Sequence, residues 1–142
     1  MAKRIQRKIA QTYARMWPRA VFEQTNLRGG AKTKKMLSEE IAFLSKPGVY
    51  VLYKDDQPYY IGQATRLRDR LWNWAKEPRS RYYHFWNFFS VFVVKNPELR
   101  NELEGILIAC MPSANSAMPK LKREPMPKQV RNLLKKIYRE KR

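Results

Sequence analysis

The chain has 142 residues, a mass of 17.0 kDa and a formal net charge of +18, from 30 Lys and Arg against 12 Asp and Glu. A single Cys and a single His exclude an internal disulfide framework and any zinc site built from several such ligands. No apolar run approaches the roughly 20 residues that cross a bilayer, and an aromatic content of 13% is too high for a disordered polycation. The composition predicts a strongly basic, folded protein of the cytoplasm or another intracellular compartment.

The positive charge is concentrated at the two ends of the chain. Residues 1–35 hold ten basic residues and one acidic residue, and residues 112–142 hold ten and two. Residues 36–111, in contrast, hold ten basic and nine acidic residues. Two basic flanks repel each other unless a polyanion lies between them, and nucleic acid is the commonest such partner. We therefore expect a nucleic-acid partner, and we expect no membrane partner.

The N-terminal flank is expected to be helical. Residues 4–16 place apolar side chains near a helical period, and the Trp17-Pro18 pair ends that run. The same acid-free stretch fits an organellar transit peptide, but it lacks Ser, which favours a basic helix of the mature chain. Residues 34–45 predict a second helix. We assign residues 1–46 to a basic helical N-terminal extension.

The nearly neutral centre predicts an α/β core. β-branched and aromatic runs predict strands, and longer stretches of helical period predict helices. In chain order, the expected elements are strand 48–53, strand 58–62, helix 64–76, strand 88–94 and helix 97–111. The fold class is therefore a small, three-stranded, mainly antiparallel sheet flanked by helices. Residues 116–142 form a basic C-terminal extension that contains a last helix at 128–140.

Two tyrosines and two arginines are expected to lie close together in this core. A symmetrical hairpin turn places Tyr50 directly opposite Tyr60, which by itself indicates no more than a stabilising aromatic pair. Arg66 and Arg70 follow one turn apart on the next helix, and guanidinium groups match the geometry of phosphate. Arg66 can equally pair with Asp69 in solvent.

Two triplets head the central segment, Gly48-Val49-Tyr50 and, after nine residues, Tyr60-Ile61-Gly62. Arg70 lies eight residues beyond the second triplet, and the segment from Glu104 to Asn115 contains a Leu-Ile pair, a Pro and the Asn. In this order, the residues resemble the GIY-YIG nuclease superfamily. The resemblance covers residues 47–115, and it implies a GIY-YIG-like nuclease core there.

The resemblance implies a metal-dependent DNA endonuclease that hydrolyses phosphodiester bonds with one Mg²⁺ or Mn²⁺. It implies that Glu104, chosen over Glu102 by its spacing to the Leu-Ile pair, is the only protein ligand of the metal, as suits a hard oxygen donor. Tyr50 would be the general base, although a phenol of pKa about 10 must first lose its proton. Arg70 would stabilise the charge of the transition state, and Tyr60 would position the phosphate or a water.

The remaining expected site residues support these four or contact nucleic acid. Gly48 and Gly62 would let the backbone approach the site, and Asn115 would fix its geometry. Cations and aromatic residues alternate from residue 79 to residue 86, which suits base stacking, but Phe85 and Trp86 are expected in the core. The expected nucleic-acid contacts are Arg66, Arg79, Arg81, Lys120, Lys122 and Arg123.

Two positions depart from the superfamily pattern. Gln63 stands where many members carry Lys, and Trp74 stands where many carry His or Tyr. Those residues help to activate the nucleophile or to bind the phosphate. The alternative function is therefore a non-catalytic nucleic-acid-binding protein, RNA- or ribosome-associated, that retains the fold. DNA is the expected partner under the first function, and RNA is the alternative.

Overall fold

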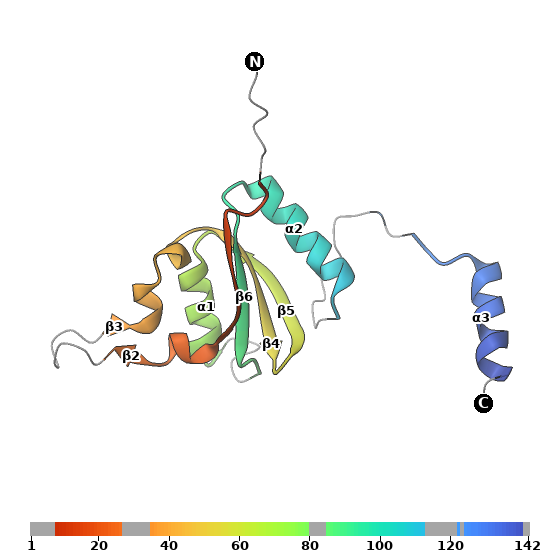
Figure 1. The fold of residues 1–142 in the computed structure, drawn as a ribbon, viewed down its shortest axis with the longest axis horizontal. Helices are drawn as coiled ribbons and strands as arrows, with labels where there is room; N and C mark the ends of the chain where they lie inside the picture. Colours follow the sequence, from red (N-terminus) through yellow and green to blue (C-terminus); the bar gives the residue numbers. More distant parts are fainter. Residues whose placement is uncertain (1–7, 27–34, 80–84, 113–121, 123, 141–142) are drawn as a thin grey trace, which may run out of the picture.

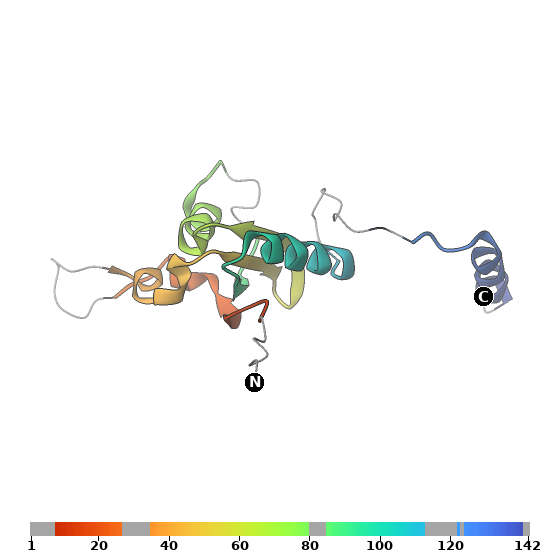
Figure 2. The ribbon, with the colours of Figure 1, turned by 90° about the horizontal axis from the view of Figure 1, so that it is seen from above.

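The structure is a computed structural model that describes residues 8–26, 35–79, 85–112, 122 and 124–140. A four-stranded antiparallel sheet in the order β1-β6-β4-β5 carries α1 on one face and α2 on the other, and α3 stands apart from the sheet (Figures 1 and 2). The strands are β1 (Thr12–Pro18), β4 (Gly48–Lys54), β5 (Gln57–Ala64) and β6 (Phe88–Val93), with β2 (Thr25–Asn26) and β3 (Lys35–Met36) forming a separate pair. The α-helices are α1 (Leu67–Lys76), α2 (Pro97–Cys110) and α3 (Lys128–Glu140). The expected α/β class is confirmed, with four strands in the sheet instead of three.

The N-terminal segment that was expected to be a helix contains an edge strand of the sheet. β1 runs antiparallel to β6, with Tyr13 opposite Phe92. At a bulge in this strand, the N–H of Met16 donates to the Ser90 hydroxyl at 3.0 Å. The helix prediction is therefore wrong over residues 12–16. Pairing with a distant strand outweighs a weak local helical period.

The second expected helix, residues 34–45, is also wrong. β3 is followed by two short 3₁₀ turns, Leu37–Glu40 and Ala42–Ser45. The guanidinium of Arg68 donates to the carbonyls of Ser38 at 3.0 Å and Ile41 at 2.7 Å. These bonds hold the segment against α1 and give two of its carbonyls a side-chain donor in place of the backbone donors of a helix.

The hairpin register differs from the symmetrical turn expected from the sequence. Tyr50 pairs with Gly62, and a bulge after Leu52 together with a two-residue turn brings Leu52 opposite Tyr60. Asp55 begins that turn with a φ of 55°, and its N–H donates to the Asn87 side chain at 2.7 Å. Tyr50 and Tyr60 are consequently diagonal neighbours on one face of the sheet, with ring centroids 6.2 Å apart.

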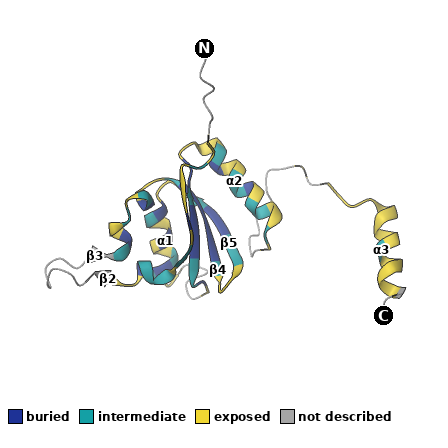
Figure 3. Ribbon diagram, in the orientation of Figure 1, coloured by how far each residue is buried: buried dark blue, intermediate teal, exposed yellow. Residues whose placement is uncertain are grey.

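The sheet separates two apolar clusters, and buried strand residues lie between α1 and α2 (Figure 3). Tyr50 and Leu52 of β4 point toward α1, whereas Val49 and Val51 point toward α2, as the two-residue period of a strand requires. The helices expected at 64–76, 97–111 and 128–140 correspond to α1, α2 and α3. α2 begins where the Asn96 side chain accepts the N–H of Glu98 at 2.9 Å. Among the described residues, no helix combines the length and the apolar character that a membrane crossing needs.

Candidate active site

Tyr50 lies in the middle of β4 with its side chain only 2% exposed. The space for its ring comes from Gly62 on the neighbouring strand. A Cβ at residue 62 would lie 2.6 Å from Cζ of Tyr50 and closer still to its hydroxyl oxygen. Gly62 thus makes room for a tyrosine ring, whereas the sequence suggested that it makes room for a ligand. The space beside Gly48 is smaller still, because a Cβ at residue 48 would overlap the carbonyl oxygen of Phe92.

Trp74 of α1 closes over this tyrosine. Its Nε1–H donates to the Tyr50 hydroxyl oxygen at 2.7 Å, and its ring packs 5.1 Å from that of Tyr60. The bond links the Tyr50 phenol to the position where the chain departs from the superfamily. The sequence shows that Trp74 departs from the superfamily pattern, but no feature of the sequence predicts its hydrogen bond to Tyr50.

The surroundings of Tyr50 hold its pKa well above the usual value of a phenol. Burial is the largest cause, and the charges of Tyr60 and Glu104 raise the pKa further. The Trp74 hydrogen bond and the positive charge of Arg70 act in the opposite direction. Groups from β4, β5, α1 and α2 therefore lie within electrostatic range of one phenol. At neutral pH the phenol keeps its proton, which suits a hydrogen-bond donor better than the general base expected from the sequence.

Glu104 projects from α2 toward β5. Its carboxylate is half-buried, and Oε2 is fully buried with no hydrogen-bond partner. Burial raises the pKa of the carboxyl, and a hydrogen bond from the Gln63 side chain lowers it by less. Gln63 also donates to the Asn101 side chain at 2.6 Å. Glu102, the competing carboxylate, is exposed, so the helix presents Glu104 to the sheet.

Replacing Glu104 with Gln is expected to stabilise the metal-free protein at neutral pH. Burial raises the pKa of the folded carboxyl above its ordinary value of 4.5. The folded state then holds the proton more tightly than the unfolded state, so the free energy of unfolding falls as the pH rises through this window. The Glu104→Gln variant has no carboxyl to titrate at this position, so its free energy of unfolding does not decrease in this way as the pH rises. Urea denaturation in EDTA at several pH values between about 4 and 7 measures the gain, and a gain that does not grow with pH would contradict the sign.

Arg70 stands at the mouth of a shallow cleft of about 290 Å³ beside the start of α1. The cleft is lined by Ala64, Thr65, Arg66, Asp69, Arg70 and Asn73. Arg70 is exposed, and Nε of Arg66 lies 3.4 Å from the Asp69 carboxylate, with both side chains in solvent. Arg66 therefore forms the exposed ion pair that its spacing to Asp69 allowed. Arg70 lines the cleft, and its charge lies within electrostatic range of Tyr50.

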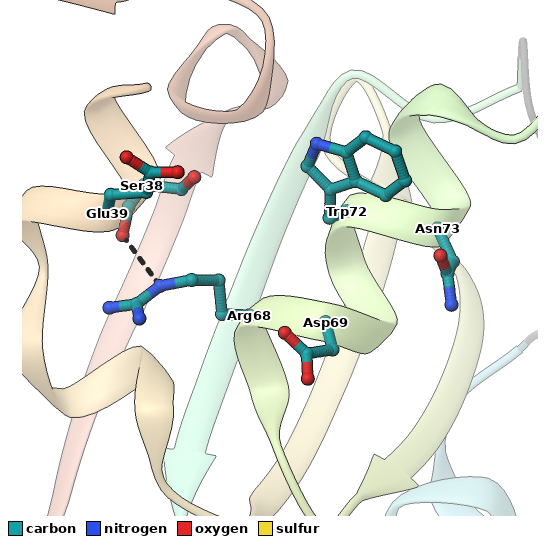
Figure 4. A pocket seen from close by; sticks show the side chains of 6 residues that line it. All are labelled: Ser38, Glu39, Arg68, Asp69, Trp72 and Asn73. Carbon is teal, nitrogen blue, oxygen red and sulfur yellow. Dashed lines mark hydrogen bonds between the residues drawn. The ribbon is translucent and has the colours of Figure 1, made fainter. Parts of the chain in front are cut away.

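A second depression of about 260 Å³ lies against the same helix (Figure 4). Arg68 points into it and donates to the Ser38 carbonyl, and Trp72 stands at its side. Both guanidinium bonds of Arg68 go to backbone carbonyls. Arg68 thus has a structural role that its sequence position did not reveal, and this depression shares Asp69 and Asn73 with the cleft at Arg70.

The other expected contact residues are scattered. Arg79 is exposed, and the Lys122 ammonium pairs with Glu124 at 3.2 Å in solvent. Phe85 was expected in the core but is 52% exposed and stacks on Tyr59 with ring centroids 4.7 Å apart, whereas Trp86 is buried as expected. The predicted residues that lie outside the described part of the chain are Arg81, Asn115, Lys120 and Arg123.

The residues present fit a divalent cation held by one carboxylate. Oε2 of Glu104 is a buried oxygen without a partner, and Mg²⁺ and Mn²⁺ prefer such hard donors. Within the described ranges, no three Asp, Glu, His or Cys side chains gather as a ligand set. Water and phosphate oxygens would complete the coordination shell, as is usual for Mg²⁺.

The chain is similar to solved structures of one bacterial domain, the GIY-YIG N-terminal endonuclease domain of UvrC from Thermotoga maritima, bound to its catalytic divalent cation, magnesium. The identity is 31%, and the match covers 47% of this chain and 82% of that chain, at a TM-score of 0.41. Two point mutants of the same domain, one asparagine-to-alanine and one tyrosine-to-phenylalanine, each match at 31% identity and a TM-score of 0.41. They cover 47% and 48% of this chain and 81% and 82% of theirs. No family model and no curated protein matches the chain.

The antiparallel sheet flanked by helices and the paired triplets are consistent with a GIY-YIG nuclease-like fold. The chain belongs to the GIY-YIG superfamily through this core, and the resemblance found in the sequence is confirmed. The two chains share 31% identity over a match that covers 82% of that domain, and this chain carries the motif residues Tyr50, Tyr60, Arg70 and Glu104.

Proposed function

We propose that the protein is a metal-dependent endonuclease that hydrolyses phosphodiester bonds of DNA. The observation that carries this proposal is the buried, partnerless oxygen of Glu104, within electrostatic range of Tyr50. A buried acceptor without a partner is costly to a protein, and a site for a cation is one reason to keep it. Arg70 also acts on the same phenol and is exposed to a ligand.

Each residue of the site has a distinct role in this proposal. Glu104 would hold one Mg²⁺ or Mn²⁺, which supplies Lewis-acid stabilisation of the charge on the phosphate. Arg70 would contact the phosphate oxygens from the cleft, where a guanidinium matches their geometry. Tyr50 would keep its proton and donate a hydrogen bond into the site, and Tyr60 would orient the phosphate or the attacking water.

The comparisons and the charge of the chain support a DNA substrate and a divalent cation. The similar UvrC domain is an endonuclease domain bound to its catalytic magnesium. A net charge of +18, concentrated in the two flanks, attracts a nucleic-acid backbone. The test is incubation of the full chain with supercoiled plasmid and Mg²⁺. Nicked circles that form with Mg²⁺ and not with EDTA support the proposal.

A non-catalytic nucleic-acid-binding function is the second candidate. Two observations favour it: the Tyr50 oxygen already accepts the Trp74 indole N–H, and Gln63 is bonded to Asn101. Trp74 and Gln63, the two residues that depart from the superfamily pattern, are thus both hydrogen-bonded within the protein. Under this function the chain binds DNA and structured RNA alike and leaves the plasmid intact with Mg²⁺ or Mn²⁺.

Replacing both Arg66 and Arg79 with Gln is expected to weaken the salt dependence of DNA binding. Each cation that neutralises a phosphate contributes about 0.9 to the slope of log affinity against log salt. The double variant should therefore flatten the slope by up to about 1.8, as measured by fluorescence anisotropy over a series of salt concentrations. Lys54→Gln, at the end of β4 remote from Arg66, is the control for Arg66→Gln alone, and an equal loss of slope there would contradict a specific contact at the start of α1.

A further inference from the structure

One face of the sheet is only partly covered. α2 packs on β4 and β5, and beside it an apolar groove of about 210 Å³ runs over β1, β6 and β4. The groove is lined mainly by Tyr13, Val51, Tyr53, Phe92 and Met111. Tyr13 is 67% exposed and stacks on Phe92 with ring centroids 6.2 Å apart. The solvent face of an antiparallel sheet is normally polar. Val51 is buried at the floor of this groove, but Tyr13 is exposed and Tyr53, Phe92 and Met111 are only half-buried, so these four apolar side chains are incompletely covered.

The C-terminal helix also has an apolar face that is exposed to solvent. On a helical wheel of 100° per residue, the apolar side chains of α3 occupy an arc of roughly 140°; they are Val130, Leu133, Leu134, Ile137 and Tyr138. Leu133 is 58% exposed, and every described side chain of α3 except that of Leu134 is exposed. The opposite face carries five cations, Lys128, Arg131, Lys135, Lys136 and Arg139. An isolated helix of this length is marginal in water, so such a helix needs a surface for its apolar face.

We propose that α3 is the cover of this groove, and that its apolar face docks over β1 and β6 of the same chain. The groove lining contains one cation, Arg15, and no carboxylate, so it suits the apolar face of α3 and not the cationic one. Docking buries two apolar surfaces that are otherwise exposed. An anionic bilayer would cover α3 alone and would leave the sheet groove open.

The connection makes docking within one chain the favoured geometry. Met111, directly after α2, lines the groove itself, and α3 begins at Lys128. The chain between them can span up to roughly 50 Å when extended. A tether of this length gives an effective concentration near the millimolar range, above that of a second copy in solution. Docked in this way, α3 turns its five cations outward beside α2, on the side of the sheet that carries Glu104.

Disulfide trapping tests the docked helix without any nucleic acid or activity. In a Cys110→Ser background, which removes the single native thiol, the full chain carries Tyr13→Cys together with Leu133→Cys. Both positions are exposed in the described structure, so neither change should prevent folding. Mild oxidation should give a monomer with an internal disulfide at a rate roughly tenfold above that of the control pair. Val130→Cys, one turn away on the same face, should repeat the result with Tyr13→Cys.

The control pair combines Tyr13→Cys with Asn132→Cys, which has the same tether but lies on the opposite face of α3. Equal trapping by the control pair would show that the tether alone brings the thiols together, and it would overturn the proposal. A disulfide that links two chains would overturn docking within one chain. Trapping by neither apolar position, with an unchanged melting temperature, would also overturn it.

Discussion

Replacing Glu104 with Ala is expected to reduce Mg²⁺-dependent nicking of supercoiled plasmid by about a thousandfold, since a metal ion supplies several kcal/mol of transition-state stabilisation. The substitution removes the one carboxylate that α2 presents to Tyr50. It also removes a buried oxygen that has no hydrogen-bond partner. The melting temperature of the metal-free protein should therefore stay the same or rise, which separates a lost reaction from a lost fold.

Glu102→Ala is the matched control for this experiment. Glu102 lies on the same helix, carries the same charge and is exposed. It should retain nicking close to that of the unaltered protein. If Glu102→Ala abolishes nicking and Glu104→Ala does not, the carboxylate assigned to the site is the wrong one. If both variants nick normally, the reaction depends on neither carboxylate.

Gly62→Ala is expected to destabilise the protein by about 3 kcal/mol, at the upper end of the usual cost of overpacking a core. The new methyl group would lie 2.6 Å from Cζ of Tyr50, and the ring is buried beneath Trp74 with no free direction in which to move. Tyr50 would be forced from its position, so nicking should fall as well. Urea denaturation gives the loss of stability directly.

A double-mutant cycle identifies the cause of that loss. In a Tyr50→Ala background the ring is absent, so Gly62→Ala should cost less than about 1 kcal/mol. Gly48→Ala provides the contrast, because its methyl group would meet the backbone carbonyl of Phe92, which no side-chain substitution removes. If the Tyr50→Ala background does not reduce the cost of Gly62→Ala, the ring is not what occupies the space at residue 62.

The sequence predicts the parts of the fold whose signals are local. β4 and β6 have dense β-branched and aromatic runs, and α2 has the Asn96 cap and a proline in its first turn. β1 was missed because its partner lies far along the chain, as the 74-residue separation of Met16 and Ser90 shows. A pairing at that range leaves no mark on local periodicity.

The hairpin register was missed for a similar reason. The side chain of Asn87, 32 residues away, accepts the N–H of Asp55 and also donates to its carboxylate at 2.9 Å. These bonds hold a two-residue turn, with a bulge after Leu52. The face shared by Tyr50 and Tyr60 could still be predicted, because a shift of two residues keeps every side chain on the same face.

The sequence and its resemblance to the superfamily propose the members of the candidate site, but they do not predict the surroundings of those residues. Spacing distinguished Glu104 from Glu102, and the structure turns Glu104 toward the sheet. Burial holds the pKa of Tyr50 above its usual value, and the hydrogen bond from Trp74 acts in the opposite direction. Burial and side-chain hydrogen bonds follow from the packing of α1 against β4, which no local pattern encodes.

The most direct measurement is the number of Mn²⁺ ions bound per chain, from the loss of the free Mn²⁺ signal in electron paramagnetic resonance. We predict one ion for the unaltered protein, one for Glu102→Ala, and none for Glu104→Ala at the same ion concentration. Equal binding by the unaltered protein and Glu104→Ala, or no binding by either, would contradict a metal centre at this carboxylate.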